Sequence, residues 1–542
     1  MGHVGTDPNS PHKIAVKCCE DLKNYSLHIG KGHDESSDSK NQGNFIELIK
    51  FFATFNDKVD GVVLTNAPRN AKYTSPQIQK EILHIFATKV RDVIRKEIGD
   101  AKFCILVDEA RDESKREQME IILRFVDKYG FIRERFFHIV HVKDTTALTL
   151  KKKICDVLSC NDLKIQNIRG QGYDEGSNMR GEWNGLQVLF LRECPYAYYV
   201  HCFAHKLQLA LVAASREAKS VHQFFENLNF IINIVVGSSK RNDELQSAQV
   251  AEIESMIASN EIETGRGANQ IVLETISKEG TNYSQRGDSE AAYMVLTSFE
   301  FVLILHLMKK IMGFTNCLCR ALQQNSQDIL NAMKLVSTTK SLLQNLRNEK
   351  CEHFLDTVKS FCEKNEIDVP DMNARYTRAR GRSCRQNEES FMTIEHHFII
   401  DVFIAAIDFQ LQELDNRFSE HAVELLRLSA ALSPQDAYKS FKIDDNMSTL
   451  SELCRGLAIL GKSKIYNLID RLIRLVLTLP VSTATIERSF SAMKLVKTRL
   501  RSRMEDEFLA DNLVVYIEKE IAKDFTTEMI MDEFYSMKDR RR

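Results

Sequence analysis

Residues 102–107 read KFCILV and run directly into Asp108 and Glu109. A short apolar run bounded by charge predicts a buried strand, although periodicity alone does not exclude a helix. Two further runs follow, MEIILRFVD at 119–127 and FIRERFFHIVHV at 131–142. They are separated by Lys128-Tyr129-Gly130, and because glycine tolerates turn geometry, this spacing predicts a hairpin. The stretch therefore predicts three consecutive strands.

The next segments predict helices alternating with strands. Thr145 and Thr146 are suited to cap a helix over LTLKKKICDVL at 148–158, whose apolar residues have helical spacing. LKIQNIRGQGYDEGSNM at 163–179 predicts a strand, a glycine-containing turn that holds Asp174, and the start of another helix. A short strand at 196–200 and a helix at 203–214 come next. The resulting order is that of an RNase H-like domain.

Three acidic residues occupy the strand and helix positions at which an RNase H-like domain carries its acidic site residues. Asp108 follows the first strand, Asp174 ends the fourth, and Glu487 lies on a later helix. Mg²⁺ prefers oxygen ligands, and two ions roughly 3.5 to 4 Å apart activate an attacking oxygen while stabilising the leaving one. Clustered carboxylates repel one another without metal, so the combination points to nucleic-acid chemistry. A single acid at a strand end is a common surface feature, and Asp112 and Glu175 are the nearest competitors.

The motifs around these acids carry a family resemblance. They are GHDES, NFIELIKFF, FCILVDEARDESKREQM, GQGYDEGSNMRGEWNGLQ, VHCFAHKLQLAL and LPVSTATIERSFSAMKLVKTRLRSRM. From about residue 30 to about residue 520 the chain resembles hAT-superfamily DNA transposases, including plant proteins of the zinc finger MYM-type protein 1-like group. The strings around Asp174 and Glu487 are the most specific.

The resemblance implies an α/β plus all-α fold, in which a large helical insertion interrupts an RNase H-like catalytic core and a hAT dimerisation region stands at the C-terminal end. The expected order is a mostly disordered segment (1–42), a helical segment (43–98), the first part of the core (99–214), the helical insertion (215–415), and the end of the core with the dimerisation region (416–542). It also implies that Asp108, Asp174 and Glu487 bind two Mg²⁺ or Mn²⁺ ions and cleave and join DNA.

Two other family elements have counterparts here. Cys202 and His205 match a Cys-x-x-His element that lies next to the catalytic centre in these transposases. His205 is therefore a catalytic candidate, as a residue that orients a catalytic group or contacts a phosphate, with a packing role as the alternative. Where relatives carry Thr-Arg-Trp, this chain has Thr281-Asn282-Tyr283. Tyr283 keeps the ability to stack on a base, but the arginine contact is lost.

Local charge predicts a DNA-binding surface that the net charge of −2 does not. Between 488 and 503 the chain has basic residues and no acidic ones, and such a stretch beside a carboxylate site is suited to bind phosphates. A solvated helix face is the alternative. A second arginine-rich stretch at 373–386 predicts a linker with DNA contact, an import signal or a plain linker. The basic residues of the first stretch are Arg488, Lys494, Lys497, Arg499, Arg501 and Arg503.

Length and composition limit the number of structural units and the cellular compartment. A chain of 542 residues, 43% of them hydrophobic, is long enough for two to four structural units. We expect no membrane span, since no apolar stretch approaches about 20 residues. Thirteen cysteines without framework spacing indicate a reducing compartment, so a nuclear or cytosolic protein follows, and we expect the nuclear location. The family resemblance implies that the C-terminal region forms a homodimer or higher oligomer, with Leu509, Leu513 and Tyr516 in its interface or, alternatively, in the intramolecular core.

Two functions remain open from the sequence. The first is a metal-dependent DNA transposase or nuclease that uses the acidic triad. The second is a decayed or domesticated protein that binds DNA or protein and dimerises without cleaving. The intact triad favours the first, while the altered Thr-Arg-Trp element and the absence of an upstream Cys and His zinc module in this sequence favour the second.

Overall fold

The computed structural model describes residues 42–68, 72–174, 176–181, 184–237, 283–349, 351–376, 392–418, 449–498 and 501–537. The expected disorder of residues 1–42 lies outside these ranges, apart from Gln42. The competitor Glu175 and most of the second basic stretch lie outside them as well.

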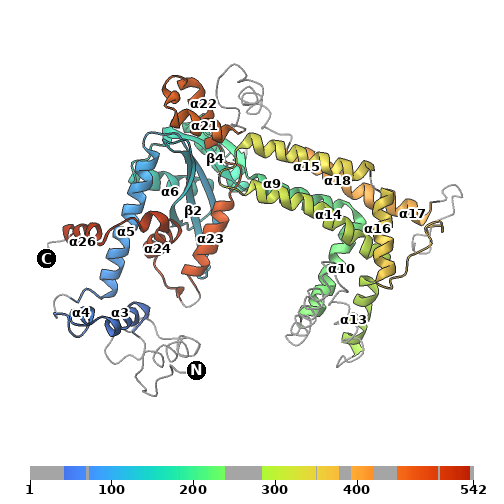
Figure 1. Ribbon diagram of the computed structural model, residues 1–542, viewed down its shortest axis with the longest axis horizontal. Coiled ribbons are helices and arrows are strands. Elements are labelled where there is room, and N and C mark those ends of the chain that lie inside the picture. The colour runs from blue at the N-terminus through green and yellow to red at the C-terminus, as the bar shows by residue number, and fades with distance from the viewer. Residues whose placement is uncertain are drawn as a thin grey trace. The chain divides into compact units, whose positions relative to one another are not determined.

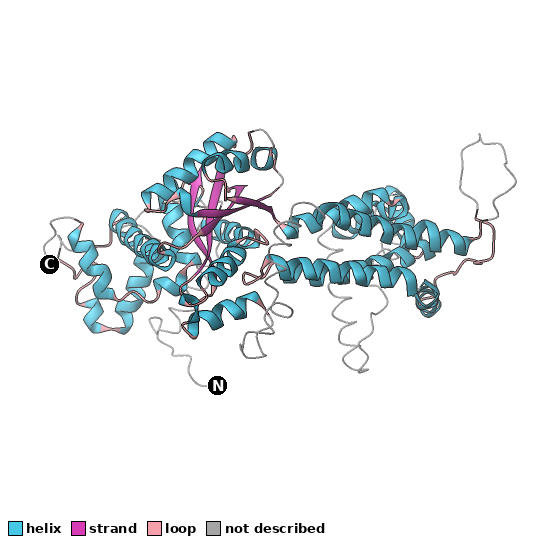
Figure 2. Cartoon of the chain, turned by 90° about the horizontal axis from the view of Figure 1, so that it is seen from above, coloured by secondary structure: helices cyan, strands magenta, loops and turns pink. Residues whose placement is uncertain are grey.

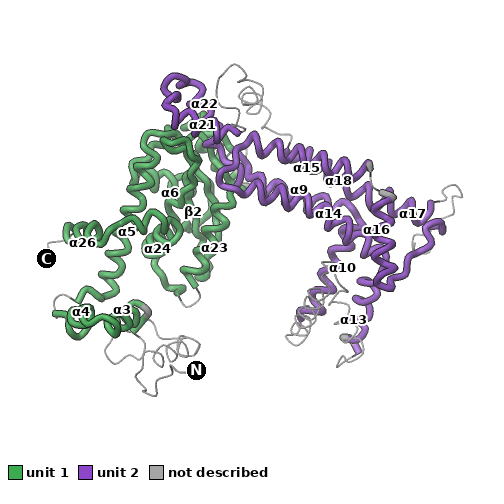
Figure 3. The backbone as a smooth tube through the Cα atoms, in the orientation of Figure 1, with its two compact units in different colours: residues 1–199, 483–542 green, residues 200–482 purple. Residues whose placement is uncertain are grey.

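The chain divides into two compact units, coloured separately in Figure 3. Unit 1 comprises residues 1–199 and 483–542, and unit 2 comprises residues 200–482. The sequence predicts these boundaries at 214 and 416. The first one differs because helix α9 (Phe203–Glu217) packs along α18 (Ala405–Phe418) of unit 2 rather than closing the core. The core resumes at 483, just before the helix that carries Glu487.

A five-stranded mixed sheet forms the centre of unit 1, and its spatial order is β3-β2-β1-β4-β5. Strand β1 is antiparallel to β2 and parallel to β4, while β2 and β3 are antiparallel. Helices cover both faces of the sheet (Figure 2). This explains why β1 and β2 read as nearly continuous apolar runs rather than alternating ones. The strands are β1 (Phe103–Arg111), β2 (Glu117–Val126), β3 (Ile132–His141), β4 (Ile168–Tyr173) and β5 (Tyr198–His201).

Local signals explain the connections. The β2–β3 hairpin turns at Gly130, whose φ of 85° is a conformation that glycine adopts without strain. Asp127 fastens this turn by accepting hydrogen bonds from the backbone N–H groups of Tyr129 and Phe131, both at 2.9 Å. Thr146 caps the next helix by accepting from the N–H of Thr149 at 3.4 Å. The predicted hairpin and cap are both confirmed.

The C-terminal helices of unit 1 complete the core. Helix α23 (Ala484–Val496) packs against β1 and β2, and α24 (Asp506–Ile517) packs against α5 and β3. Leu509 and Leu513 are fully buried within this core. The intramolecular alternative is therefore right for these two residues, and the expectation that they form a dimer interface is wrong. Tyr516 is half exposed.

The remaining helices of unit 1, labelled in Figure 1 where there is room, flank this sheet or precede it. They are α3 (Asn44–Phe55), α4 (Asp57–Asp60), α5 (Pro76–Ile98), α6 (Ala147–Cys160), η1 (Ile165–Asn167), α7 (Ser177–Arg180), α8 (Leu186–Glu193), α25 (Lys519–Ala522) and α26 (Thr527–Ser536).

Unit 2 is helical throughout its described residues after β5, as expected for the insertion. One of its helices, η2, is a π-helix. Besides α9 and α18, its helices are α10 (Lys219–Val236), α13 (Tyr283–Leu296), α14 (Phe299–Leu322), α15 (Ile329–Glu349), α16 (Cys351–Lys364), α17 (Ile394–His396), η2 (His397–Ile404), α21 (Leu450–Ile459), η3 (Lys462–Lys464) and α22 (Asn467–Thr478).

Helix α14 corrects one expectation from composition. Of the described helices it is the one long and apolar enough, by length and composition, to cross a membrane. Half of its most apolar window is buried inside the protein. A single helix of this kind is therefore weak evidence for a membrane span.

Candidate functional site

Asp108 and Asp174 lie on adjacent parallel strands of the sheet. Asp108 stands near the carboxyl end of β1, where full burial gives way to partial exposure. Asp174 directly follows β4, and its Oδ1 accepts a hydrogen bond from the N–H of Gly176 at 3.0 Å. A Cβ atom at residue 176 would come within 3.1 Å of that oxygen and 2.7 Å of Asn178 Oδ1, so a larger residue there would displace both side chains. Parallel neighbouring strands thus deliver both aspartates to one edge.

Glu487 reaches the same region from the first turn of α23. Its side chain is exposed, whereas Ile486 and Ser489 on the opposite side of the helix are buried against the core. The amphipathic pattern of α23 therefore fixes which way Glu487 points.

The electrostatics of Asp108 show that the three acids lie close together. Burial raises the pKa of Asp108 to about 7, and the charges of Asp174 and Glu487 act in the same direction. The N–H of Glu109 opposes the shift by donating to Asp108 Oδ1 at 2.8 Å. The sequence-predicted triad is thus brought into mutual electrostatic range by β1, β4 and α23.

A fourth acid, Glu109, belongs to the same group. Burial raises its pKa to about 7, the side-chain hydrogen bond from Asn178 opposes the shift, and Asp108 and Asp174 add to it. Asn178 Nδ2 lies 3.4 Å from each Glu109 carboxylate oxygen and donates to the carbonyl of Thr145 at 2.9 Å. Glu109 is a neighbour that sequence analysis did not select.

Two hydroxyl–carboxylate pairs hold α23 on the sheet. Ser489 bonds to Glu120 of β2, and Thr485, one helical turn earlier, bonds to Glu134 of β3. Glu120 is the direct cross-strand partner of Asp108 in the antiparallel β1–β2 register. The pairs flank Glu487 in sequence, so they set the position of its helix relative to β1.

Hydrogen bonds and burial together indicate the charge state of Glu120. The Ser489 hydroxyl has two acceptors, Glu120 Oε2 and the carbonyl oxygen of Ile486 at 2.8 Å. One hydroxyl proton serves one acceptor at a time, so Ser489 does not fully compensate a charged Glu120. Burial raises the pKa of Glu120 to about 8, the bond to Ser489 opposes the shift, and Asp108 adds to it. Oε1 of Glu120 is buried without a hydrogen-bond partner among the described atoms, which a neutral carboxyl tolerates better than a charged one.

The neutral state of Glu120 predicts a pH dependence of stability. Its pKa of about 8 in the folded chain exceeds the ordinary 4.5. Its contribution is therefore fully present below pH 4.5 and is lost as the pH rises through 8, at about 1.4 kcal/mol per pH unit within that window. Glu120→Gln, which stays neutral, should remove this part of the slope. Pulsed deuterium labelling of β1 and β2 peptides across a urea gradient measures it.

A matched control for that experiment is Glu113→Gln, because Glu113 is an exposed acid in the connection between β1 and β2. We expect the control to keep the wild-type pH dependence. Equal slopes for Glu120→Gln and wild type would contradict the assignment of a neutral Glu120.

The donor set suits a hard divalent cation. Asp108, Asp174 and Glu487 lie within electrostatic range of one another. Burial raises the pKa of Asp108, and the charges of the other two acids add to the shift, so a cation beside these carboxylates would be stabilised. Among the described residues, no group of three or more His, Cys, Asp and Glu side chains closes tightly enough to hold an ion. In this conformation the acids therefore influence one another without forming a complete ligand shell.

Four of the seven predicted DNA-contacting residues lie at the surface, on α23 or just beyond it in sequence. Arg488 and Lys494 are exposed on α23, and Arg501 and Arg503 are exposed just beyond it. Seven residues separate Glu487 from Lys494, or about 10 Å along a helix. Arg499 lies outside the described residues.

Lys497 corrects the expectation of a DNA contact. Only 1% of its side chain is exposed, and its Nζ lies 2.7 Å from Asp112 Oδ2. Asp112 also accepts from Gln118 and from two backbone N–H groups, and although burial opposes ionisation, Lys497 holds the pKa of Asp112 below its usual range. Lys497 and Asp112 therefore form an ion pair inside the core. This pairing explains the role of Lys497 and also that of Asp112, the competitor of Asp108.

His205 and Tyr283 belong to unit 2, so the structure does not place them against the acidic cluster. The His205 ring lies 5.5 Å from that of His201. Tyr283 begins α13 with 89% of its surface exposed, and the Arg286 guanidinium lies 5.0 Å from its ring. Their catalytic and DNA-binding roles stay predictions.

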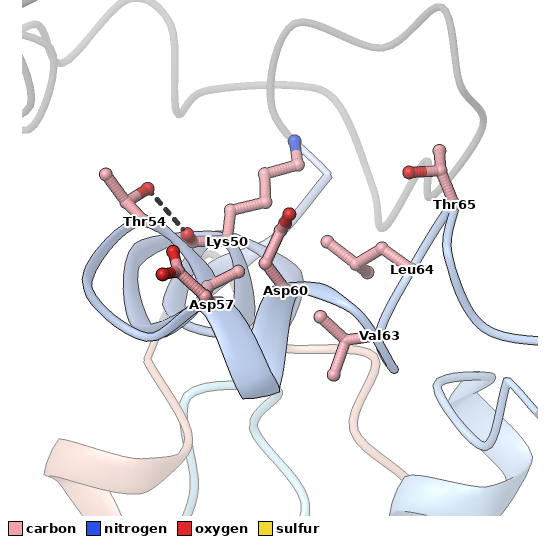
Figure 4. Close-up of a pocket in the computed structure, with 8 residues that line it drawn as sticks. Lys50, Thr54, Asp57, Asp60, Val63, Leu64 and Thr65 are labelled. Atoms are coloured by element: carbon pink, nitrogen blue, oxygen red, sulfur yellow. Dashed lines mark hydrogen bonds between the residues drawn. The ribbon is translucent and has the colours of Figure 1, made fainter.

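A separate pocket of about 440 Å³ lies at the N-terminal helices α3 and α4 (Figure 4). Lys50, Asp57 and Asp60 give it a polar lining, together with Val63 and Leu64. It contains none of the predicted site residues, so pocket shape does not identify the candidate site.

Comparison with known proteins agrees with the fold. The ZMYM1/FAM200, RNase-like domain matches residues 27–185, and the hAT family C-terminal dimerisation region matches residues 451–521. The chain is 22% identical over 389 residues to the mouse "52 kDa repressor of the inhibitor of the protein kinase" and 21% identical over 393 residues to the human protein. Each match covers 66% of this chain and 50% of the relative.

These matches confirm the resemblance predicted from the motifs. The chain carries an RNase-like domain and a hAT dimerisation region, and it is a distant homologue of the two repressor proteins. It spans about half the length of the curated relatives it matches.

Proposed function

We propose that this hAT-transposase-derived protein is a nuclear DNA-binding protein that cleaves DNA strands at the cluster of Asp108, Asp174 and Glu487 with Mg²⁺ or Mn²⁺, and that it associates with itself. The observation that supports the proposal is that β1, β4 and α23 bring three acids within electrostatic range of one another: burial raises the pKa of Asp108 to about 7, and the charges of Asp174 and Glu487 add to the shift. A buried acid with other acids beside it is typical of metal-dependent phosphoryl chemistry.

The proposed division of labour follows from the positions of the residues. Asp108, Asp174 and Glu487 would hold the ions, and Glu120 and Glu134 keep α23 in place through Ser489 and Thr485. When bound, the ions would activate the attacking oxygen and stabilise the leaving one. The exposed Arg488 and Lys494 would hold the DNA backbone beside the acids.

A second function is supported by a different observation. The acids do not form a closed ligand shell in this conformation, and the relatives carry the name of a repressor. A protein that binds DNA or protein and dimerises without cleaving is therefore the alternative. The arginine lost from the Thr-Arg-Trp element favours it.

Plasmid nicking separates the two functions. Purified protein should convert supercoiled plasmid to the open form with Mg²⁺ or Mn²⁺ and not in excess chelator. DNA binding, measured in parallel by fluorescence anisotropy with Ca²⁺, reports the second function alone. Binding without nicking under any divalent ion would overturn the nuclease and favour the binding protein.

The basic residues on α23 give a separate prediction about DNA affinity. Lys494→Gln should weaken binding to all DNA sequences alike, because a phosphate contact carries no sequence information. The slope of log K against log salt should fall by about 1. Lys152→Gln, an exposed lysine on α6, is the matched control and should leave the slope unchanged. An unchanged slope for Lys494→Gln would remove this residue from the DNA-binding surface.

A further inference from the structure

In the described part of the chain, the ladder between β1 and β4 ends before it reaches Asp108 and Asp174. Its last pair is Leu106–Gly172, and each aspartate stands two residues further along the chain. Strand β1 continues in its ladder with β2, but β4 ends at Tyr173. Contacts other than the ladder must therefore hold the turn that carries Asp174 beside β1.

Asn178, in the short helix α7 that follows this turn, makes such contacts. Its Nδ2 donates to the carbonyl oxygen of Thr145, just before α6, at 2.9 Å, and lies 3.4 Å from each carboxylate oxygen of Glu109 on β1. These neighbours are all acceptors, so the amide nitrogen faces them and the amide oxygen faces the other way. One side chain thereby joins α7 to β1 and to the loop that leads into α6.

The amide oxygen of Asn178 faces the turn itself. A Cβ atom at residue 176 would lie 2.7 Å from this oxygen and 3.1 Å from Asp174 Oδ1, so both oxygens lie close to one point beside Gly176. The N–H of Gly176 donates to the same Asp174 oxygen at 3.0 Å. Met179, the next residue, is buried in the core of unit 1. The position of Asn178 is therefore coupled to that of the Asp174 side chain through a compact turn.

The other strand next to β4 does not provide the same connection. The Tyr199 hydroxyl on β5 donates to the backbone carbonyl of Asp174 at 3.0 Å. In the sheet, however, β5 lies on the side of β4 that faces away from β1. This bond fixes the turn to β5 and leaves its distance from β1 open. Among the described hydrogen bonds of the turn, those that reach β1 come from Asn178.

We propose that Asn178 is a positioning residue of the acidic cluster, which holds the turn carrying Asp174 beside β1 so that Asp174 and Asp108 bind the same divalent ions. In this role it acts through Glu109 and the carbonyl of Thr145. Partners that orient metal ligands typically contribute 10- to 100-fold to metal affinity. The inference rests on the proposed function, because it concerns how that same site is kept in place.

Mn²⁺ binding to the full chain, measured by calorimetry without DNA, tests the proposal. Asn178→Leu is close in size but has no N–H donor, and it should raise the Kd for Mn²⁺ about 10- to 100-fold. The matched control is Asn161→Leu, which should leave this Kd unchanged. Asn161 also donates from Nδ2 to a backbone carbonyl, that of Val157 at 2.8 Å, but at the opposite end of α6 from Thr145. Equal Mn²⁺ affinity of Asn178→Leu and wild type would overturn the proposal.

A double-mutant cycle with Glu109→Ala tests the path of the effect. Once Glu109 is removed, the connection to β1 is already lost, so Asn178→Leu should raise the Kd by a smaller factor than it does in wild type. If the two substitutions multiplied in full, Asn178 would act without Glu109, and the proposed contact would be refuted.

Deuterium uptake in the absence of metal gives a readout that does not depend on the ions. Asn178→Leu should speed exchange in α7 and at the start of α6 together, because one side chain joins them, while β2 exchanges as in wild type if the core is intact. Unchanged exchange in both segments would overturn the proposal. If wild type binds no Mn²⁺ but the two segments still lose protection together, the metal-dependent nuclease is refuted and the positioning role of Asn178 stands.

Discussion

Asp174→Asn is expected to abolish metal-dependent nicking, with a fall in rate of at least about 10³-fold. Asparagine keeps the Oδ1 acceptor for the N–H of Gly176, which lies 3.0 Å away, so the turn after β4 is preserved. It removes the charge that a divalent ion needs between Asp108 and Glu487. Single-turnover nicking of supercoiled plasmid at saturating Mg²⁺ or Mn²⁺ gives the rates.

Two controls make this result specific. Asp156→Asn changes an exposed acid on α6 of the same unit and should nick at the wild-type rate. Sedimentation and DNA anisotropy of Asp174→Asn should match wild type, because Asp174 lies outside the dimerisation region at 451–521 and the basic residues of α23 are unaltered. Cleavage by Asp174→Asn at the wild-type rate would refute the site assignment.

The second large effect is on the free energy of unfolding. It comes from a buried ion pair between β2 and β3 that bonds to the first turn of α23. Arg124 of β2 and Glu134 of β3 are 1% and 4% exposed, and Arg124 Nη1 lies 2.5 Å from Glu134 Oε1. The other Glu134 oxygen accepts the hydroxyl of Thr485. Arg124→Leu leaves a buried carboxylate uncompensated, and we expect unit 1 to lose about 3 to 5 kcal/mol of unfolding free energy.

The double variant Arg124→Leu/Glu134→Leu should recover most of that loss, since apolar side chains replace a buried pair at little cost. About 1 kcal/mol should remain, because Thr485 loses its partner. Arg133→Leu is the control: Arg133 also pairs across this hairpin, with Asp127, but it is 39% exposed and should cost less than about 1 kcal/mol. Pulsed labelling of β2 peptides in urea measures all three. If the double variant were no more stable than Arg124→Leu, the unpaired charge of Glu134 would not be the cause of the lost unfolding free energy.

The strands, the hairpin and the order of the core could be predicted because each rests on local pattern. KFCILV is apolar and bounded by charge, and Gly130 allows the turn between β2 and β3. The neighbouring placement of Asp108 and Asp174 was predictable because an RNase H-like order puts their strands side by side. The prediction that Asp108 follows its strand is wrong by a few residues, because β1 continues to Arg111 in its ladder with β2. These features can be predicted without knowing which distant side chains contact one another.

The features that escaped prediction depend on partners far away in sequence. Lys497 reads as one more basic residue in a surface run, but its partner Asp112 is 385 residues away. Glu120 could have been found, because a lone acid within the apolar run MEIILRFV is costly unless it has a function. Leu509 and Leu513 have the same spacing whether they face a core or a second chain, so periodicity could not separate these outcomes.

The discontinuity of unit 1 has a consequence for the synthesis of the protein in the cell. Its sheet is complete in sequence by residue 201, but α23 and α24 follow only after residue 482. At about 5 to 20 residues per second, a ribosome takes roughly 15 to 60 s to make the stretch between. During that interval the apolar surface of β1, β2 and β3 that these helices cover is open to solvent. The nascent chain is then a natural client for chaperones, and translation that stops inside unit 2 releases an aggregation-prone half-core.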